Sequence, residues 1–201
     1  MGKVDIFTTD KKYNIIYADP PWSYRDYTSK AVAEKNLNAN SKKSVVMKYD
    51  VMKTTNICEL PIGNLAAEDC ILFMWVTMPK LNEVFDVIKA WGFKYSTVGF
   101  TWIKKNKKNK NSNFWGMGRW TRSNAELCLI GIKGKPKRVS ASVHSVVESC
   151  IEEHSKKPDV VREKIVELCG DLPRVELFAR QHADGWDCWG NETDKFTQEV
   201  G

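Results

Sequence analysis

Residues 13–22 have the sequence YNIIYADPPW, and this stretch decides the fold that we expect. Its first part, Tyr13–Ala18, is mostly apolar and rich in aromatic and β-branched residues, which is typical of a buried strand. The two prolines that follow Asp19 have no N–H group and restrict φ to about −65°. We therefore expect a buried strand that ends at Ala18 and continues directly into a rigid turn.

Four further apolar runs predict strands, and helical patterns lie between them. The predicted strands are Cys70–Val76, Tyr95–Ile103, Glu126–Ile132 and Val175–Ala179. Apolar residues at helical spacing predict helices over 81–91 and 161–168, with Gly92 and Gly170 as their C-terminal caps. A less regular pattern predicts a helix over Val45–Leu60.

Apolar strands that alternate with helices favour one architecture. They indicate the α/β class, with a Rossmann-like, doubly wound and mostly parallel sheet that carries helices on both faces. In such sheets ligands bind beyond the carboxyl ends of the strands. We therefore expect the residues that directly follow the strands to form the functional site.

The turn Asp19-Pro20-Pro21-Trp22 is the most specific local pattern in the chain. It suits the exocyclic amino group of adenine, whose nitrogen is a poor nucleophile because its lone pair is delocalised into the ring. The Asp19 carboxylate and the Pro20 carbonyl can accept the two N–H groups, and the carboxylate also stabilises positive charge growing on nitrogen. Pro21 keeps the turn rigid, and Trp22 can stack on a base that has left its duplex. The alternative is an ordinary strand-end turn, capped by the aspartate and packed by the tryptophan.

The segment 104–124 is basic and aromatic, and we interpret it as a nucleic-acid surface. The chain has a formal net charge of +6, and five of its lysines fall within seven residues: Lys104, Lys105, Lys107, Lys108 and Lys110. Lysines contact phosphates, while aromatic side chains such as Trp120 offer surfaces for an unstacked base. Arg119, Arg122 and Asn124 are candidates for positioning the target strand. The alternative is a solvated basic loop whose aromatic residues fold back into the core.

The composition excludes several classes of protein. The six cysteines form no Cys-x-x-Cys pair and no histidine completes a zinc site, so we expect reduced cysteines and no metal. No stretch approaches the roughly 20 apolar residues of a membrane helix, and the N-terminus lacks the order of a secretion signal. We expect an intracellular, cytoplasmic protein without a membrane partner.

Several ordered blocks, together with the Asp19–Trp22 turn, resemble the adenine-N6 methyltransferases of the MTA-seventy family. The blocks are Leu72–Thr77, Gly118–Glu126, His154–Asp159, Val175–Arg180 and Gly185–Glu192, and the resemblance covers about residues 4–192. The family contains the catalytic subunit of the eukaryotic messenger-RNA adenosine methylase and small bacterial and phage DNA adenine methylases. The resemblance implies a permuted class I methyltransferase fold, in which the catalytic turn precedes the cofactor-binding strand, here Val175–Ala179.

The resemblance implies S-adenosylmethionine as the cofactor, with S-adenosylhomocysteine as the product. Carried over to matching positions, it puts Lys157 on the methionine carboxylate of the cofactor. It puts Arg180 and Asn191 on the ribose hydroxyls, and Glu192 on the ribose or the adenine.

Other cofactor contacts are implied in the same way. Asp5 and Ile6 match a pair that holds the cofactor's adenine in relatives, although their spacing to Asp19 is shorter here. Phe178 supports the same pocket, and Asp19 faces the cofactor as well as the base. Ala183 departs from the pattern, because the RNA-modifying relative has an asparagine there that helps to bind ribose.

The ending Gly185–Glu192 is closer to the bacterial and phage enzymes than to the RNA enzyme, so we predict methylation of adenine N6 in DNA. RNA stays open as the alternative substrate, because a flipped adenine looks the same in both polymers. A catalytically silent nucleic-acid-binding subunit is a second alternative, although such partners have lost the acidic or the aromatic residue of the turn. We expect one methyltransferase domain over residues 1–192 and a polar tail over 193–201. The absence of a separate target-recognition domain favours low sequence specificity or a homodimer.

Overall fold

The fold is built on a seven-stranded sheet in the order β5-β3-β4-β2-β1-β6-β7. A computed structural model describes residues 2–23, 51–118, 120–152, 156–191 and 193 of the chain. Its strands are β1 (Tyr13–Ala18), β2 (Ala66–Val76), β3 (Lys94–Lys105), β4 (Glu126–Lys133), β5 (Val146–Cys150), β6 (Arg174–Leu177) and β7 (Asp187–Trp189). Neighbouring strands are parallel except that β4 runs antiparallel to both β2 and β3. The predicted α/β architecture with a mostly parallel sheet is therefore confirmed.

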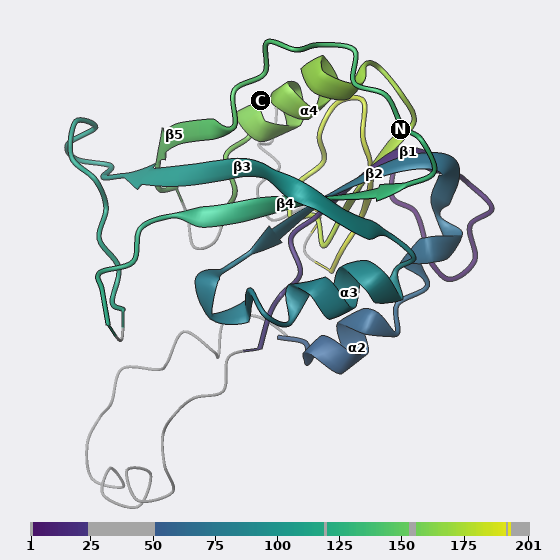
Figure 1. Cartoon of the computed structure of the whole chain (residues 1–201), viewed down its shortest axis with the longest axis horizontal. Coiled ribbons are helices and arrows are strands. Elements are labelled where there is room, and N and C mark those ends of the chain that lie inside the picture. The colour runs from purple at the N-terminus through teal and green to yellow at the C-terminus, as the bar shows by residue number, and fades with distance from the viewer. Residues whose placement is uncertain (1, 24–50, 119, 153–155, 192, 194–201) are drawn as a thin grey trace, which may run out of the picture.

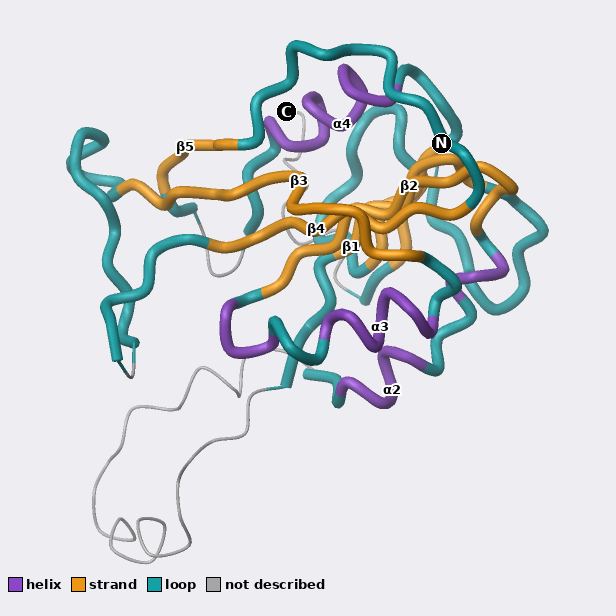
Figure 2. The backbone as a smooth tube through the Cα atoms, in the orientation of Figure 1, coloured by secondary structure: helices purple, strands orange, loops and turns teal. Residues whose placement is uncertain are grey.

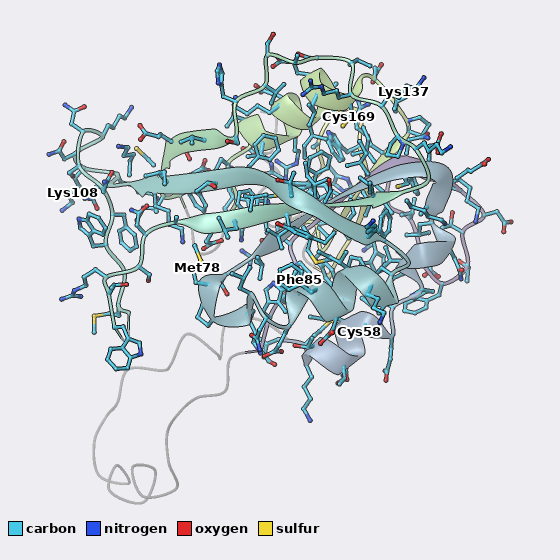
Figure 3. All side chains as sticks on the ribbon, in the orientation of Figure 1. Cys58, Met78, Phe85, Lys108, Lys137 and Cys169 are labelled. Atoms are coloured by element: carbon cyan, nitrogen blue, oxygen red, sulfur yellow. The ribbon has the colours of Figure 1, made fainter. Side chains whose placement is uncertain are left out.

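Helices cover both faces of this sheet, as predicted (Figures 1 and 2). Helices α2 (Thr54–Cys58) and α3 (Val84–Ala90) pack on one face, and α4 (Val160–Cys169) packs on the other. Figure 3 accordingly has Phe85 of α3 and Cys169 of α4 on opposite sides of the sheet. Because side chains alternate along a strand, β1 contributes Ile16 to the core beneath α3 and Tyr17 to the core beneath α4.

Helices α2 and α3 are shorter than their sequence patterns suggested, whereas α4 extends one residue beyond the predicted range at each end. Two short 3-10 helices, η2 (Ile62–Asn64) and η3 (Met78–Lys80), flank β2, and α3 begins only at Val84. The predicted caps are confirmed, because Gly92 and Gly170 have φ values of 82° and 87° that suit a residue without Cβ. The prediction of a helix over Val45–Leu60 is wrong for residues 51–53, where α2 has not yet begun, and residues 45–50 lie outside the described residues.

Two strands were not predicted, and one predicted strand is shorter than expected. β5 and β7 are the edge strands of the sheet and have only 5 and 3 residues, too few for a clear apolar pattern. β6 ends at Leu177 rather than at Ala179, because Phe178 has a φ of 59° that does not fit a strand.

The sheet topology brings most strand ends to one edge. β1, β2, β3, β5, β6 and β7 point the same way, so their carboxyl ends share an edge with the start of the reversed strand β4. The hairpin that connects β3 to β4, residues 106–125, projects from this edge away from the body of the sheet (Figure 1).

Among the described residues, no helix has the length and apolar character needed to span a bilayer.

The packing of β2 predicts how much single leucine side chains contribute to the free energy of unfolding. Leu72 is fully buried under α3, whereas Leu172 is 40% exposed in the loop after α4. We expect Leu72→Ala to lower the free energy of unfolding by about 2–5 kcal/mol, because it leaves a cavity in the core. The matched control Leu172→Ala should cost less than about 1 kcal/mol. Urea unfolding of both variants measures the difference, and equal losses would contradict this placement of β2.

Candidate active site

A row of alternating charges lies at the carboxyl edge of the sheet. Asp19 follows β1, Lys104 lies near the end of β3, Glu126 begins β4, and Lys157 enters from the segment before α4. The Lys157 ammonium is 2.8 Å from Asp19 Oδ2 and 3.3 Å from Glu126 Oε2. Lys104 Nζ is 2.5 Å from Glu126 Oε1. We call these four residues the charge row.

Aromatic side chains line the charge row. Lys157 Nζ lies 5.7 Å from the ring centroid of Trp75, and Lys104 Nζ lies 5.0 Å from that of Trp102. Both distances allow attraction between the cation and the ring face. The Trp75 indole N–H donates to the Tyr17 hydroxyl at 2.6 Å, which fixes the ring that faces Lys157. The cations are therefore held by rings as well as by carboxylates.

The environment shifts the pKa of each titratable group at the centre of the row. Burial raises the pKa of the Asp19 carboxyl, and Lys157 offsets that effect only in part. Burial acts in the same direction on Glu126, but Lys157 and Lys104 outweigh it and leave its pKa below the usual value. Burial acts to lower the pKa of Lys157, yet the two carboxylates raise it above the ordinary value, so Lys157 stays charged.

The Asp19–Trp22 turn is held by backbone hydrogen bonds. The Trp22 amide donates to the Pro20 carbonyl at 2.9 Å, and the Met52 amide donates to the Pro21 carbonyl at 2.8 Å. A carbonyl oxygen has two lone pairs, so Pro20 can accept a second donor. The turn therefore fixes Asp19 and keeps a carbonyl beside it.

Trp22 lies elsewhere than we expected for a stacking residue. Its ring is 4% exposed and packs in the core beneath α3, and its indole N–H donates to the Trp75 carbonyl at 3.2 Å. A ring buried in this way has no free face for a base. In the structure Trp22 instead ties the Asp19–Trp22 turn to β2.

The residues expected to bind the cofactor's ribose lie where β6 and β7 end. The Ala179 amide donates to the Trp189 carbonyl at 2.9 Å, which joins the two strand ends. A side chain at Gly190 would overlap the backbone of Ala179, so only glycine permits this close approach. Arg180 is near enough for its charge to lower the pKa of Asp19, although burial of Asp19 dominates. Asn191 is exposed, and Glu192 lies outside the described residues.

An aromatic group stands beside these strand ends. The Phe178 and Trp189 rings pack edge to face with centroids 5.2 Å apart, and the Phe7 ring also packs edge to face with Trp189 at 6.4 Å. Ile6 is buried in the core, whereas Asp5 is exposed and accepts hydrogen bonds from the Phe7 amide and the Thr8 hydroxyl, each at 3.0 Å. Asp5 therefore holds the turn that carries Phe7, and Ile6 belongs to the core against which Phe178 and Trp189 pack.

The residues expected to bind nucleic acid divide into two groups. Lys107, Lys108, Trp120 and Arg122 are exposed on the hairpin, and Arg119 lies outside the described residues. The others make contacts within the protein. Lys104 belongs to the charge row, and Lys105 lies 3.4 Å from Glu148.

Asn124 supports the base of the hairpin. Its side-chain oxygen accepts from the Lys104 amide at 3.1 Å, and its amide nitrogen donates to the Lys104 carbonyl at 2.9 Å and to the Phe114 carbonyl. Contact with nucleic acid stays a prediction for Asn124 and for the rest of the set.

Sequence reasoning missed Glu126 and a second ion pair. Glu126 is the last residue of the block Gly118–Glu126, which carries the family resemblance. An acidic residue at the start of an apolar strand is the sequence signal that could have assigned it to the site. Arg162 of α4 binds Glu176 of β6 through two bonds of 2.6 and 2.7 Å, with its guanidinium 5.9 Å from the Tyr17 ring. This pair joins α4 to the sheet beneath the charge row. No spacing in the sequence marks it, since its members are 14 residues apart on different elements.

The sequence is similar to those of known methyltransferases. The sequence matches the MT-A70 (MTA-seventy) family over residues 13–192. It is 35% identical to the type II methyltransferase M.MunI of Mycoplasma sp over 192 residues, which cover 90% of this chain and 78% of that protein. It is 27% identical to the N(6)-adenosine-methyltransferase MT-A70-like protein of Arabidopsis thaliana, covering 94% of this chain and 24% of that one. Identity to the human N(6)-adenosine-methyltransferase catalytic subunit METTL3 is 25%, over 91% of this chain and 28% of that one.

The charge row predicts a pH-dependent contribution of Glu126 to stability. Because the pKa of folded Glu126 is lowered, its contribution is present above the unfolded pKa of about 4.3 and is lost as the pH falls through the folded value. We expect Glu126→Gln to lower the unfolding free energy by about 1–3 kcal/mol at pH 7.5, and the deficit to shrink below about pH 4.3.

Glu148→Gln is the matched control, because the Glu148 side chain is 56% exposed against 14% for Glu126. It should change the unfolding free energy by less than about 1 kcal/mol. Urea unfolding between pH 3 and 8 measures both variants. A Glu126→Gln deficit that is constant with pH would contradict an ionised Glu126 between two lysines.

Proposed function

The chain belongs to the MT-A70 family, and on that premise we propose that it is an S-adenosylmethionine-dependent methyltransferase of adenine N6 in DNA. One observation carries the proposal: the Asp19 carboxylate stands at the carboxyl end of β1, fixed by a two-proline turn and by Lys157 at 2.8 Å. This is the edge at which sheets of this kind bind their ligands.

The residues at this edge fit S-adenosylmethionine. Lys157 offers an ammonium with three donors for the carboxylate, and Asn191 offers both a donor and an acceptor for a ribose diol. The close approach of Gly190 to Ala179 brings Asn191, the next residue, to the end of β6, which Phe178 and Arg180 follow in the chain. Asp19 supplies the negative charge that a sulfonium requires nearby. Glu192 would complete the set of ribose and adenine contacts that the family implies.

The chain's own residues would prepare the amino group for attack. When bound, S-adenosylmethionine supplies a methyl group on a positively charged sulfur. Asp19 accepts one N–H of the target adenine and the Pro20 carbonyl accepts the other, which favours the pyramidal nitrogen with its lone pair available. A carboxylate whose pKa is raised binds such a donor more strongly than an ordinary one, and it stabilises positive charge on nitrogen. The nitrogen then loses a proton, and no general base is needed for that step.

The supporting residues keep this geometry. Lys157 orients Asp19 while Glu126 holds Lys157, and Trp22 ties the turn to β2 through the Trp75 carbonyl. We assign these residues to positioning, with Lys157 also on the cofactor carboxylate. The exposed Lys107, Lys108 and Arg122 would contact the phosphates of the target strand.

DNA is the substrate that the comparisons favour. The match to a type II methyltransferase extends over 78% of that protein, whereas the chain spans about a quarter of the eukaryotic N(6)-adenosine methyltransferases. The eukaryotic relatives are N(6)-adenosine methyltransferases, which supports the N6 position. A silent subunit is disfavoured because the turn keeps both Asp19 and Trp22. We further propose that residues 1–192 form one methyltransferase domain.

The first test removes the carboxylate. We expect Asp19→Ala to abolish methylation, with a loss of at least about 100-fold, because the amino group then lacks its acceptor. Affinity for S-adenosylhomocysteine, whose sulfur carries no positive charge, should stay within a few-fold. The exposed Asp10 serves as the control, and Asp10→Ala should keep full activity. Incorporation of labelled methyl groups into DNA and RNA, measured in parallel, gives the rate and the substrate. An active Asp19→Ala variant would remove Asp19 from the mechanism, and labelling of RNA alone would reject DNA.

The second test asks which end of the cofactor Lys157 binds. We expect Lys157→Met to weaken binding of S-adenosylhomocysteine about tenfold or more, because a charged hydrogen bond to the carboxylate is lost. Binding of 5′-methylthioadenosine, which has no carboxylate, should change less than about threefold. Lys156→Met is the matched control, since Lys156 pairs with Glu152 and Asp159. Calorimetry measures all these affinities, and equal weakening of both ligands would contradict a contact with the carboxylate.

A further inference from the structure

The β3–β4 hairpin carries two loops of different character. We call residues 106–113 the lysine loop and residues 114–123 the aromatic loop. The boundary is a backbone bond of 2.8 Å from the Phe114 amide to the Lys104 carbonyl. In the aromatic loop, Met117 is 90% exposed and Trp120 is 91% exposed, more than any other large apolar side chain that the structure describes. Large apolar side chains that gather in one exposed loop suit an interaction site better than an isolated one does.

The aromatic loop is closed and held by hydrogen bonds within the hairpin. The Gly116 amide donates to the Ser123 carbonyl at 2.7 Å, which closes the loop. A side chain at Gly118 would overlap the backbone of Thr121, so the tip needs glycine to turn this tightly. Asn124 fastens the base of the loop to Phe114 and Lys104. The described contacts therefore hold Met117 and Trp120 at the outer end of a closed loop.

Charge indicates the chemistry of the partner. No aspartate or glutamate occurs between Lys104 and Ala125, whereas seven lysines and arginines do. Lys107, Lys108 and Lys110 are exposed in the lysine loop, and Figure 3 has Lys108 at the outer limit of the hairpin. An exposed apolar tip beside an entirely basic surface suits a polyanion that has an apolar interior. A nucleic-acid duplex, with stacked bases inside two rows of phosphates, has this construction.

The aromatic loop lies on the same side of the sheet as the proposed reaction site. The hairpin projects from the sheet edge that carries Asp19, and its base includes Lys104 of the charge row (Figure 1). A base within a duplex cannot enter a site of this kind, so the target must be extruded, which leaves a gap in the stack. Apolar side chains that enter such a gap offset the loss of stacking.

We propose that Met117 and Trp120 form a wedge that enters duplex DNA and fills the space left by the extruded target adenine. The proposal rests on the proposed function and names double-stranded DNA as the substrate class. The lysine loop holds the phosphates on either side, while Trp120 stacks on the bases that border the gap. Single-stranded DNA has no gap to fill, so the wedge matters only for the duplex.

The test compares one DNA in two forms, which removes the need to know the recognition sequence. Linear plasmid DNA is used native and after heat denaturation with rapid cooling, and methyl incorporation from labelled S-adenosylmethionine is measured. We expect Trp120→Ala to lower kcat/KM at least tenfold on native DNA and less than twofold on denatured DNA. Trp120→Phe, which keeps a ring, should retain at least half of the native activity.

Leu172→Ala is the matched control, because Leu172 is an exposed apolar residue before β6, at the opposite edge of the sheet. It should leave both activities unchanged. Equal losses of Trp120→Ala on both DNA forms would overturn the wedge, and so would full activity on native DNA. Activity of the unaltered protein on denatured DNA alone would overturn the wedge but keep the proposed function. Labelling of neither DNA form by the unaltered protein would reject the proposed function itself.

Discussion

The ammonium of Lys157, held between the carboxylates of Asp19 and Glu126, is the interaction on which the site depends. The sheet topology delivers two carboxylates to one small region, because β1 ends and the reversed strand β4 begins at the same edge. Two buried carboxylates without a cation would repel each other, and one would take up a proton. Lys157, at 2.8 and 3.3 Å from them, opposes this because its charge favours the ionised form of each carboxyl group. The charge row thus favours the ionised form of Asp19, which is the form that accepts hydrogen bonds.

The same arrangement accounts for the placement of the aromatic residues around the site. Trp75 faces Lys157 with its ring, receives the Trp22 indole at its carbonyl, and is itself fixed by Tyr17. One residue of β2 therefore connects the cation, the catalytic turn and the core beneath α4. Beyond the row, Lys104 links Glu126 to the base of the hairpin. A continuous series of contacts at the carboxyl ends of the strands therefore joins Asp19, the proposed catalytic group, to the hairpin, the proposed nucleic-acid surface.

Much of the fold could be predicted because its central strands are long apolar runs. β1 has the predicted bounds, and the ends of α3 and α4 are marked by Gly92 and Gly170. The edge strands β5 and β7 escaped prediction, since short strands at an edge need little apolar sequence. The early end of β6 also escaped, because only the backbone reveals the positive φ of Phe178.

The site was predicted less completely, for a physical reason. Asp19 and Lys157 could be named from local motifs and resemblance, yet their contact joins residues 138 positions apart. Trp22 illustrates the limit: the residue type suited stacking on a base, but the way β1 packs beside β2 puts its ring in the core. Glu126 was missed because its importance comes from the antiparallel direction of β4, which brings the start of that strand to the active edge.

A crystal structure of the protein with S-adenosylhomocysteine would test the central claim most directly. We expect the Lys157 ammonium within hydrogen-bond distance of the cofactor carboxylate, and the sulfur facing the Asp19 carboxylate at the carboxyl end of β1. A cofactor bound away from this edge, or an Asp19 side chain turned into the packed interior, would contradict it.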